Sequence, residues 1–236
     1  MEGSLSPQQA AELLGTAGIP PAQGDGTLTG EPVLIFMQVP TAEGAGYAYV
    51  YLSSQGVVLA RAAEHVGGSP DPDEASWSEL FDHMQTEVVS VRDAAGTPVF
   101  AVSHKKVLKS EVTVADAHGR TMGTMRQRNI LGRVRFSIEA AGHDYGSFVA
   151  ATTQMLGFDV RDPADNVVGR LVKVGQLYGV RSPMGLGHAK VPACFVLQLF
   201  QRPPLPLLTA AMPIVLDLSM NLDSVTSRAT KRGPTA

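Results

Sequence analysis

The chain has 236 residues, of which 44% are hydrophobic and 17% charged, which is enough for one large core or two small ones. The net charge of −3 provides no general attraction to nucleic acid or membranes, so we expect no nucleic-acid partner and only a local basic surface. The single cysteine, Cys194, cannot form an internal disulfide, which agrees with a cytoplasmic location.

The N-terminal residues predict a short helix followed by a linker. Ser6 is a typical N-cap, Pro7 suits the first turn, and the helix should end near Gly15 or Gly18. Residues 20–31 are rich in Gly, Pro and Thr and therefore form the expected linker. The start of the chain has neither a basic segment nor an apolar run, so we expect no signal peptide.

The next part of the chain repeats one hairpin pattern. Each unit has an acidic residue, then Gly or Asn three or four residues later, between runs of Val, Ile, Phe and Tyr. The acidic side chain would accept a backbone hydrogen bond, and the Gly or Asn tolerates positive φ. Two strands per 23 residues is the spacing of a β-barrel or sandwich, although a less regular β fold is the alternative. The acidic positions, each 23 residues after the last, are Asp93, Asp116, Glu139 and Asp162.

An earlier copy of this unit has Ser53 in the acidic place, and the insertion at 66–85 separates it from the later copies. Asp71–Leu80 within the insertion predicts a short helix that caps one end of a barrel. Its acidic stretch, Asp71–Glu79, is also the surface that a protein-interaction scaffold would use.

The last apolar segment, residues 205–222, is apolar on nearly every side, which predicts a helix buried all round. A barrel of more than about eight strands needs its interior filled, and this helix would fill it. Asp217 near its centre argues against a membrane anchor, because a carboxylate there is costly in a bilayer. We expect Asp217 to be a buried, hydrogen-bonded anchor or to lie near the barrel mouth, with a functional carboxylate as the alternative. Residues 223–236 predict a disordered polar tail.

Short motifs give the chain a resemblance to a known superfamily. These are Pro32–Gln38, Tyr49-Val50-Tyr51 before the turn at Gly56, Ala60–Glu64, the Asp-x-x-Gly hairpins and Ile214–Asp217. They are similar to the tubby C-terminal-like superfamily, and within it to the phospholipid scramblase and LURP-one-related group. The resemblance covers residues 32–222 and implies a mostly β fold, a closed antiparallel barrel of about twelve strands around the C-terminal helix. Residues 1–31 would precede this domain.

The functional implications of this resemblance are narrow. Scramblase-type members have an acidic stretch linked to calcium before the final helix, whereas Gly185–Ala193 holds no carboxylate here. They also have an acylated cysteine cluster, and this chain has only Cys194. Tubby-type members bind phosphoinositides through basic side chains on the barrel, which is an analogy at the level of the fold.

No motif of a catalytic, cofactor or metal site is present in the sequence. There is no G-x-S-x-G elbow, phosphate-binding loop or H-E-x-x-H motif, so we expect a non-enzymatic protein without a cofactor. Cys194 lies in an apolar run and should be a buried core residue. The histidines lack ligand spacing and should be structural, with His118 and His143 exposed at turns. We interpret Asp93, Asp116 and Asp162 as turn residues and not as an acid/base pair.

Residues 104–135 have a local net charge of +6, from eight basic and two acidic residues. A hairpin turning at Asn129–Gly132 would place Arg128 opposite Arg133 and Arg126 opposite Arg135 on the outer face, a set that we call the basic face. Like charges directly opposite are destabilising, so either neighbouring carboxylates or a phosphate-bearing ligand should offset them.

Our leading hypothesis is a binding module that meets anionic phospholipid at the membrane surface through the basic face. The exposed apolar residues Ile130 and Leu131 would dip into the head-group layer. The rival hypotheses are a protein-interaction scaffold and a carrier with a small ligand in the barrel mouth. Three lysines are expected to assist the basic face: Lys105, Lys106 and Lys109.

We predict that millimolar calcium will neither shift the melting temperature nor alter lipid binding, because no acidic cluster precedes the final helix. Thermal unfolding and calorimetric titration with calcium chloride would check this. Micromolar calcium affinity would contradict the prediction and favour a scramblase-like protein.

Overall fold

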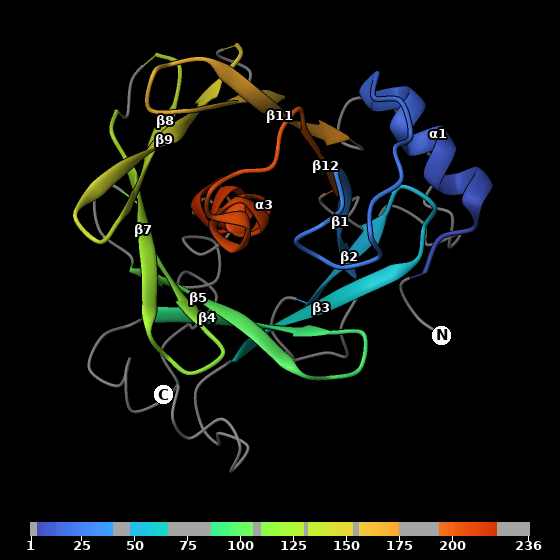
Figure 1. The fold of residues 1–236 in the computed structure, drawn as a ribbon, viewed down its shortest axis with the longest axis horizontal. Helices are drawn as coiled ribbons and strands as arrows, with labels where there is room; N and C mark the ends of the chain where they lie inside the picture. The colour runs from blue at the N-terminus through green and yellow to red at the C-terminus, as the bar shows by residue number, and fades with distance from the viewer. Residues whose placement is uncertain are drawn as a thin grey trace, which may run out of the picture.

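Twelve antiparallel strands close into a single barrel, as the sequence predicts. The computed structural model describes residues 4–39, 48–65, 86–105, 110–129, 132–152, 156–174 and 194–220. Each strand pairs with its neighbours in sequence, and β1 pairs with β12 to close the barrel (Figure 1). The strands are β1 (Val33–Val39), β2 (Ala48–Ser53), β3 (Val58–His65), β4 (Thr86–Asp93), β5 (Pro98–Lys105), β6 (Glu111–Asp116), β7 (Thr121–Gln127), β8 (Arg135–Ala140), β9 (His143–Ala150), β10 (Gly157–Arg161), β11 (Val167–Val174) and β12 (Cys194–Leu199).

Three of the four acidic repeat residues have the predicted turn chemistry. Asp93 Oδ1 accepts hydrogen bonds from the backbone N–H groups of Ala95 at 2.9 Å and Thr97 at 2.8 Å. Gly96 follows with φ of 86°, a conformation that costs glycine little. Asp116 and Asp162 accept equivalent backbone bonds in their own turns. These three carboxylates are therefore turn residues, as predicted.

The prediction for Glu139 is wrong, because Glu139 lies within β8 opposite Asp144 and the turn that follows has only two residues, Ala141 and Gly142. In the turn at Asp162, the positive φ belongs to Asp165 and not to Asn166.

The alternating strand directions give the barrel two different ends. All odd-numbered strands finish at one end, which we call the loop end, and all even-numbered strands finish at the other, the turn end. At the turn end, the tight turns at Asp93, Asp116 and Asp162 each connect an even-numbered strand to the next odd-numbered strand. α3 (Pro206–Met220) follows β12 at that end, so its own C-terminus points to the loop end.

α3 fills the interior of the barrel, as predicted, and appears end-on at the centre of Figure 1. Its side chains Met212, Ile214 and Leu216 are completely buried within the main hydrophobic core. Stacked aromatic pairs, including Phe136 and Phe148 with ring centroids 4.6 Å apart, line the inner wall. Within the described part of the chain, no helix has the length and apolarity needed to cross a membrane.

The predicted N-terminal helix is α1 (Pro7–Ala17), which packs on the outside of the barrel near β1, β2, β11 and β12 (Figure 1). Ser6 accepts from the N–H of Gln9 at its N-terminus, and Gly18 with φ of 64° ends it. Cys194 belongs to the apolar cluster between α1 and the barrel wall, and burial raises the pKa of its thiol to about 12. Its prediction as a buried core residue is confirmed.

Three predictions concern segments outside the described residues. These are the helix within the insertion at 66–85, the acid-free stretch Gly185–Ala193 and the polar tail at 223–236.

We predict that Ile214→Ala will lower the free energy of unfolding by about 2–5 kcal/mol, because the cavity left inside the barrel has nothing to fill it. Chemical denaturation would measure the loss. Val167→Ala is the control, since Val167 is an apolar residue that is 43% exposed and its change should cost less than about 1 kcal/mol. Equal losses for both variants would contradict the central role of α3.

Candidate functional site

The arginines of the basic face share the outer surface of β7 and β8, but in a register different from the predicted one. Arg126 pairs with Ser137, and the N–H of Arg128 donates to the carbonyl of Arg135 at 2.8 Å. The predicted pairs, Arg126 with Arg135 and Arg128 with Arg133, are therefore wrong by two residues. A shift of two preserves the faces, so the arginines still point outward while Phe136 points inward.

The side chain of Asn129 explains the shifted register. Its Oδ1 accepts the N–H of Arg135 at 2.8 Å, and its Nδ2 donates to the carbonyl of Arg133 at 2.6 Å. These bonds occupy the backbone groups that would otherwise continue the strand ladder. The hairpin loop is consequently longer than the four residues expected at Asn129–Gly132.

Neighbouring carboxylates offset the charge of two of these arginines. Arg126 Nε lies 3.0 Å from Glu111 Oε2, and its Nη1 lies 3.7 Å from Glu139 Oε2. Arg128 also forms an ion pair with Glu139 and donates through Nε to Ser137 Oγ at 2.7 Å. The like-charge crowding expected from the sequence is thus relieved by β6 and β8.

The other two arginines, Arg133 and Arg135, have fewer polar contacts with the described residues. Arg133 Nε donates to the carbonyl of Ala150 at 2.7 Å, and among the described residues no carboxylate forms an ion pair with it. Arg135 Nη2 lies 3.9 Å from Asp165 Oδ1, at the limit for an ion pair. Because a guanidinium group has five N–H donors, both side chains can still donate to a ligand.

Only part of the predicted assisting set lies within the described residues. Lys105 ends β5 and stands opposite Glu111 in the strand register. Lys106 and Lys109 lie outside the described residues, as do Ile130 and Leu131. The contribution of these residues to the basic face stays a prediction.

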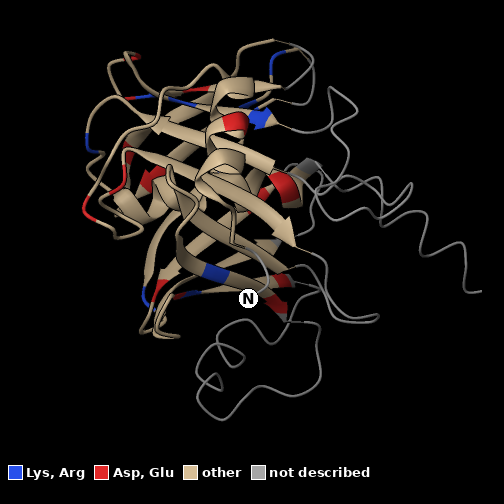
Figure 2. Cartoon of the chain, turned by 90° about the vertical axis from the view of Figure 1, so that its right-hand side faces the viewer, with Lys and Arg blue, Asp and Glu red and all other residues tan. Residues whose placement is uncertain are grey.

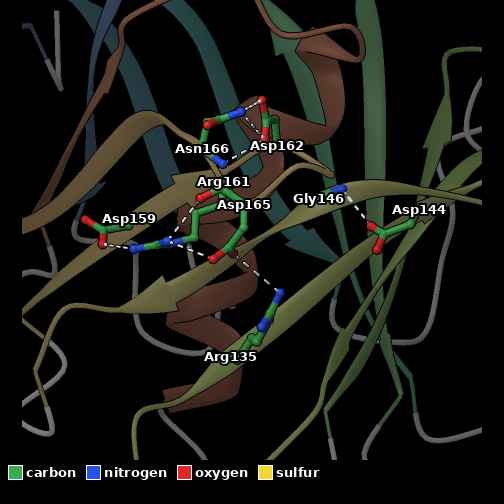
Figure 3. Close-up of polar contacts among 8 residues, drawn as sticks. All are labelled: Arg135, Asp144, Gly146, Asp159, Arg161, Asp162, Asp165 and Asn166. Atoms are coloured by element: carbon green, nitrogen blue, oxygen red, sulfur yellow. Dashed lines mark hydrogen bonds and ion pairs between the residues drawn. The ribbon is translucent and has the colours of Figure 1, made fainter.

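The sequence interpretation missed Arg161, which extends the outward-facing charges to β10. Its Nη2 donates to Asp159 Oδ2 at 3.0 Å and its Nη1 to Asp165 Oδ2 at 3.2 Å (Figure 3). The hydrogen bond to Asp159 raises the pKa of Arg161. Arg135 reaches the same Asp165 from β8, so one carboxylate links two strands that are not adjacent. Only the strand register shows that Arg135, Arg161 and Asp165 are neighbours.

The side of the barrel that carries α1 differs from this region. Figure 2 shows that most of its ribbon is uncharged, with Lys or Arg and Asp or Glu at isolated places. No block of one charge gathers in that view.

Asp217 is buried, as predicted, and anchors α3. The phenol of Tyr49 on β2 donates to Asp217 Oδ2 at 2.7 Å. Lys173 projects towards the same region with its Nζ 5.8 Å from the centroid of the Phe195 ring. Partial burial lowers the pKa of Lys173, although the charge of Asp217 acts in the opposite direction.

A second buried polar chain lies at the loop end and was not expected. His104 Nε2 lies 2.9 Å from Ser110 Oγ, which in turn lies 2.6 Å from Ser219 Oγ of α3. His104 Nδ1 lies 3.4 Å from Glu87 Oε2. His104 and Ser110 are both buried and hydrogen-bonded, so this chain ties α3 to β5 and does not present a nucleophile to solvent.

Two further histidines and the possibility of a metal site remain to be described. His118 and His143 are exposed, as predicted. In the ranges that the structure describes, no three His, Cys, Asp or Glu side chains come together as a metal site would require.

Comparison with known proteins does not assign this chain to a family. No protein-family description matches the sequence, and no curated protein matches it significantly. A solved structure of a protein from Arabidopsis thaliana is similar with a TM-score of 0.42 and 15% identity, over 80% of this chain and 93% of that one. The fold described above therefore rests on the strand pairing of this chain itself.

We predict that Tyr49→Phe will lower the free energy of unfolding by about 1–3 kcal/mol, because a buried carboxyl oxygen loses its phenol donor. Tyr51→Phe is the matched control. The Tyr51 phenol donates to the carbonyl of Ala210, which lies within α3 and also accepts an intrahelical hydrogen bond. The free energy of unfolding should therefore fall less in Tyr51→Phe than in Tyr49→Phe. Equal losses in chemical denaturation would contradict the anchoring role of Asp217.

Proposed function

We propose that this protein is a non-enzymatic binding module of the tubby- and scramblase-like type that binds anionic phospholipid head groups at its basic face. The proposal depends on one observation. Four arginines, Arg126, Arg128, Arg133 and Arg135, project from one outer surface of β7, β8 and their connection, and three of them are about half-exposed. Such a module would act peripherally at the cytoplasmic surface of a membrane.

The carboxylates around the basic face do not prevent this function. An exposed ion pair contributes only about 0–1 kcal/mol, so replacing a carboxylate partner by a lipid phosphate costs little. A phosphate group accepts two parallel N–H bonds from one guanidinium group, as a carboxylate does, and can accept from further donors. The carboxylates reduce the net charge, so binding should be weak, reversible and sensitive to salt.

The two rival functions have less support. A carrier would need room inside the barrel, and in the described residues α3 and the aromatic side chains fill the interior. The scaffold hypothesis depends on the acidic stretch Asp71–Glu79, which lies outside the described residues.

We predict that Arg133→Gln with Arg135→Gln will weaken binding to acidic vesicles roughly 30-fold at low salt, at about 1 kcal/mol per arginine near an anionic surface. These two arginines have the fewest internal partners on the basic face, so the fold should persist. Co-sedimentation with phosphatidylcholine vesicles, with and without phosphatidylglycerol, would measure the change.

Arg92→Gln with Arg120→Gln is the charge-matched control, because both residues lie beside the tight turns at the turn end. This control should retain most of the binding. No binding by the parent protein at low salt, or equal losses in both double variants, would overturn the proposed lipid site.

A further inference from the structure

Four tight turns share one pattern, in which a residue with positive φ stands three positions after the first turn residue. In three of them this residue is glycine, with φ between 78° and 86°: Gly56, Gly96 and Gly119. The fourth turn has Asp165 at this position, with φ of 66°. The β8–β9 turn is of another kind, because both Ala141 and Gly142 have positive φ there. Aspartate adopts this conformation less readily than glycine, and polar contacts of its side chain stabilise it.

The side chain of Asp165 has such an interaction with two arginines. Its Oδ2 lies 3.2 Å from Arg161 Nη1, and its Oδ1 lies 3.9 Å from Arg135 Nη2 (Figure 3). The Asp165 side chain is 64% exposed, so it lies on the solvent side of the two arginines. The turn therefore places one anion between two cations that belong to β8 and β10.

A buried hydroxyl on the same surface has no hydrogen-bond partner in the part of the chain that the structure describes. Ser147 of β9 stands opposite Ser137 of β8 and opposite Arg161 of β10 in the strand register. Residues directly opposite one another share a face of the sheet, so Ser147 belongs to the surface that these arginines cover. Its side chain is only 2% exposed, and its Oγ is a buried side-chain atom without a hydrogen-bond partner among the described residues. Such a group is rare in folded proteins.

We propose that Arg135, Arg161 and Ser147 form a binding site for a phosphate monoester, and that the carboxylate of Asp165 is its built-in competitor. The inference rests on the proposed function, because it extends the basic face across β9 to β10. A phosphate monoester would take the place of the carboxylate between the two guanidinium groups and accept the Ser147 hydroxyl. Asp165 lowers the affinity for every anion, since the two cations are already partly neutralised.

The competitor also makes the site selective. A phosphodiester has one negative charge, the same as the carboxylate that it must displace. A phosphate monoester has a charge of about −1.5 to −2 at neutral pH and three terminal oxygens. It therefore gains more from two guanidinium groups and a hydroxyl than the carboxylate loses. The ligand class is a terminal phosphate, either on a lipid head group or free in solution.

Asp165→Asn tests the competitor, because asparagine tolerates positive φ and removes only the charge. Binding to phosphatidylcholine vesicles containing phosphatidic acid should tighten about fivefold or more, the effect of one unit charge at close range near water. Glu12→Gln on the exposed surface of α1 is the charge-matched control and should change nothing. Asp165→Gly should give the same gain and a higher melting temperature, since it restores the glycine of the other turns.

Ser147→Ala tests the hydroxyl. It should weaken binding to phosphatidic acid vesicles about fivefold or more, as expected for a lost hydrogen bond to a charged group. The melting temperature should not fall, because the hydroxyl has no partner in the described structure. Binding to vesicles with phosphatidylglycerol, a diester, should change much less.

The outcomes separate this inference from the proposed function. If the parent binds both acidic vesicles and neither Asp165→Asn nor Ser147→Ala alters the preference for phosphatidic acid, the monoester site is overturned and the lipid function stands. If vesicles fail to bind but Asp165→Asn binds inorganic phosphate in calorimetry and Ser147→Ala does not, the phosphate site stands and the lipid function fails. Equal gains for Asp165→Asn and Glu12→Gln would reduce the effect to net charge and overturn the inference.

Discussion

The structure depends on the need to fill the interior of a twelve-strand barrel. An interior of this width cannot be closed by the inward side chains of the strands alone, so α3 must be apolar around its whole circumference. Apolar packing has no preferred direction, however, and would allow the helix to slide or rotate. Tyr49 and Tyr51 of β2 prevent this by binding Asp217 and the carbonyl of Ala210, two points on the helix that lie about two turns apart.

A filled interior leaves the outer wall as the surface of the barrel that α3 does not cover. α1 already covers the apolar outer surface of β1, β2, β11 and β12, on the opposite side of the barrel from β7 in Figure 1. The charged outer surface of β7, β8 and β10 is therefore free of both helices. Its arginines come from strands that also supply the core, so the scaffold holds their backbones in a fixed arrangement.

Much of the fold could be predicted from the sequence because its signals are local. The 23-residue step of the turns and the alternation of apolar residues determine the strands and their faces. The apolar run at 205–222 likewise predicts the central helix. The register of β7 and β8 could not be derived in this way, because the side chain of Asn129 decides where the ladder ends. The helix in the insertion and the polar tail remain predictions.

The site was less accessible to sequence reasoning, since its contacts join strands far apart in the chain. The charge of residues 104–135 indicates a basic surface, but only the barrel register brings Glu111 to Arg126 and Asp165 to Arg135. Ser147 has no distinguishing signal at all in the sequence. Only the structure places Ser147 opposite Arg161 and shows that its hydroxyl has no partner within the described ranges.

The repeat makes departures from its own pattern informative. In the regular turns, the acidic residue binds its own backbone and a glycine takes the positive φ. Glu139 instead directs its carboxylate to Arg126 and Arg128, and Asp165 replaces the glycine and contacts Arg135. Both departures place a carboxylate on an arginine of the basic face, and they occur in consecutive hairpins, β8–β9 and β10–β11. The two carboxylates thus bring negative charge to different arginines of one outer surface, which limits the like-charge repulsion that the sequence alone predicts.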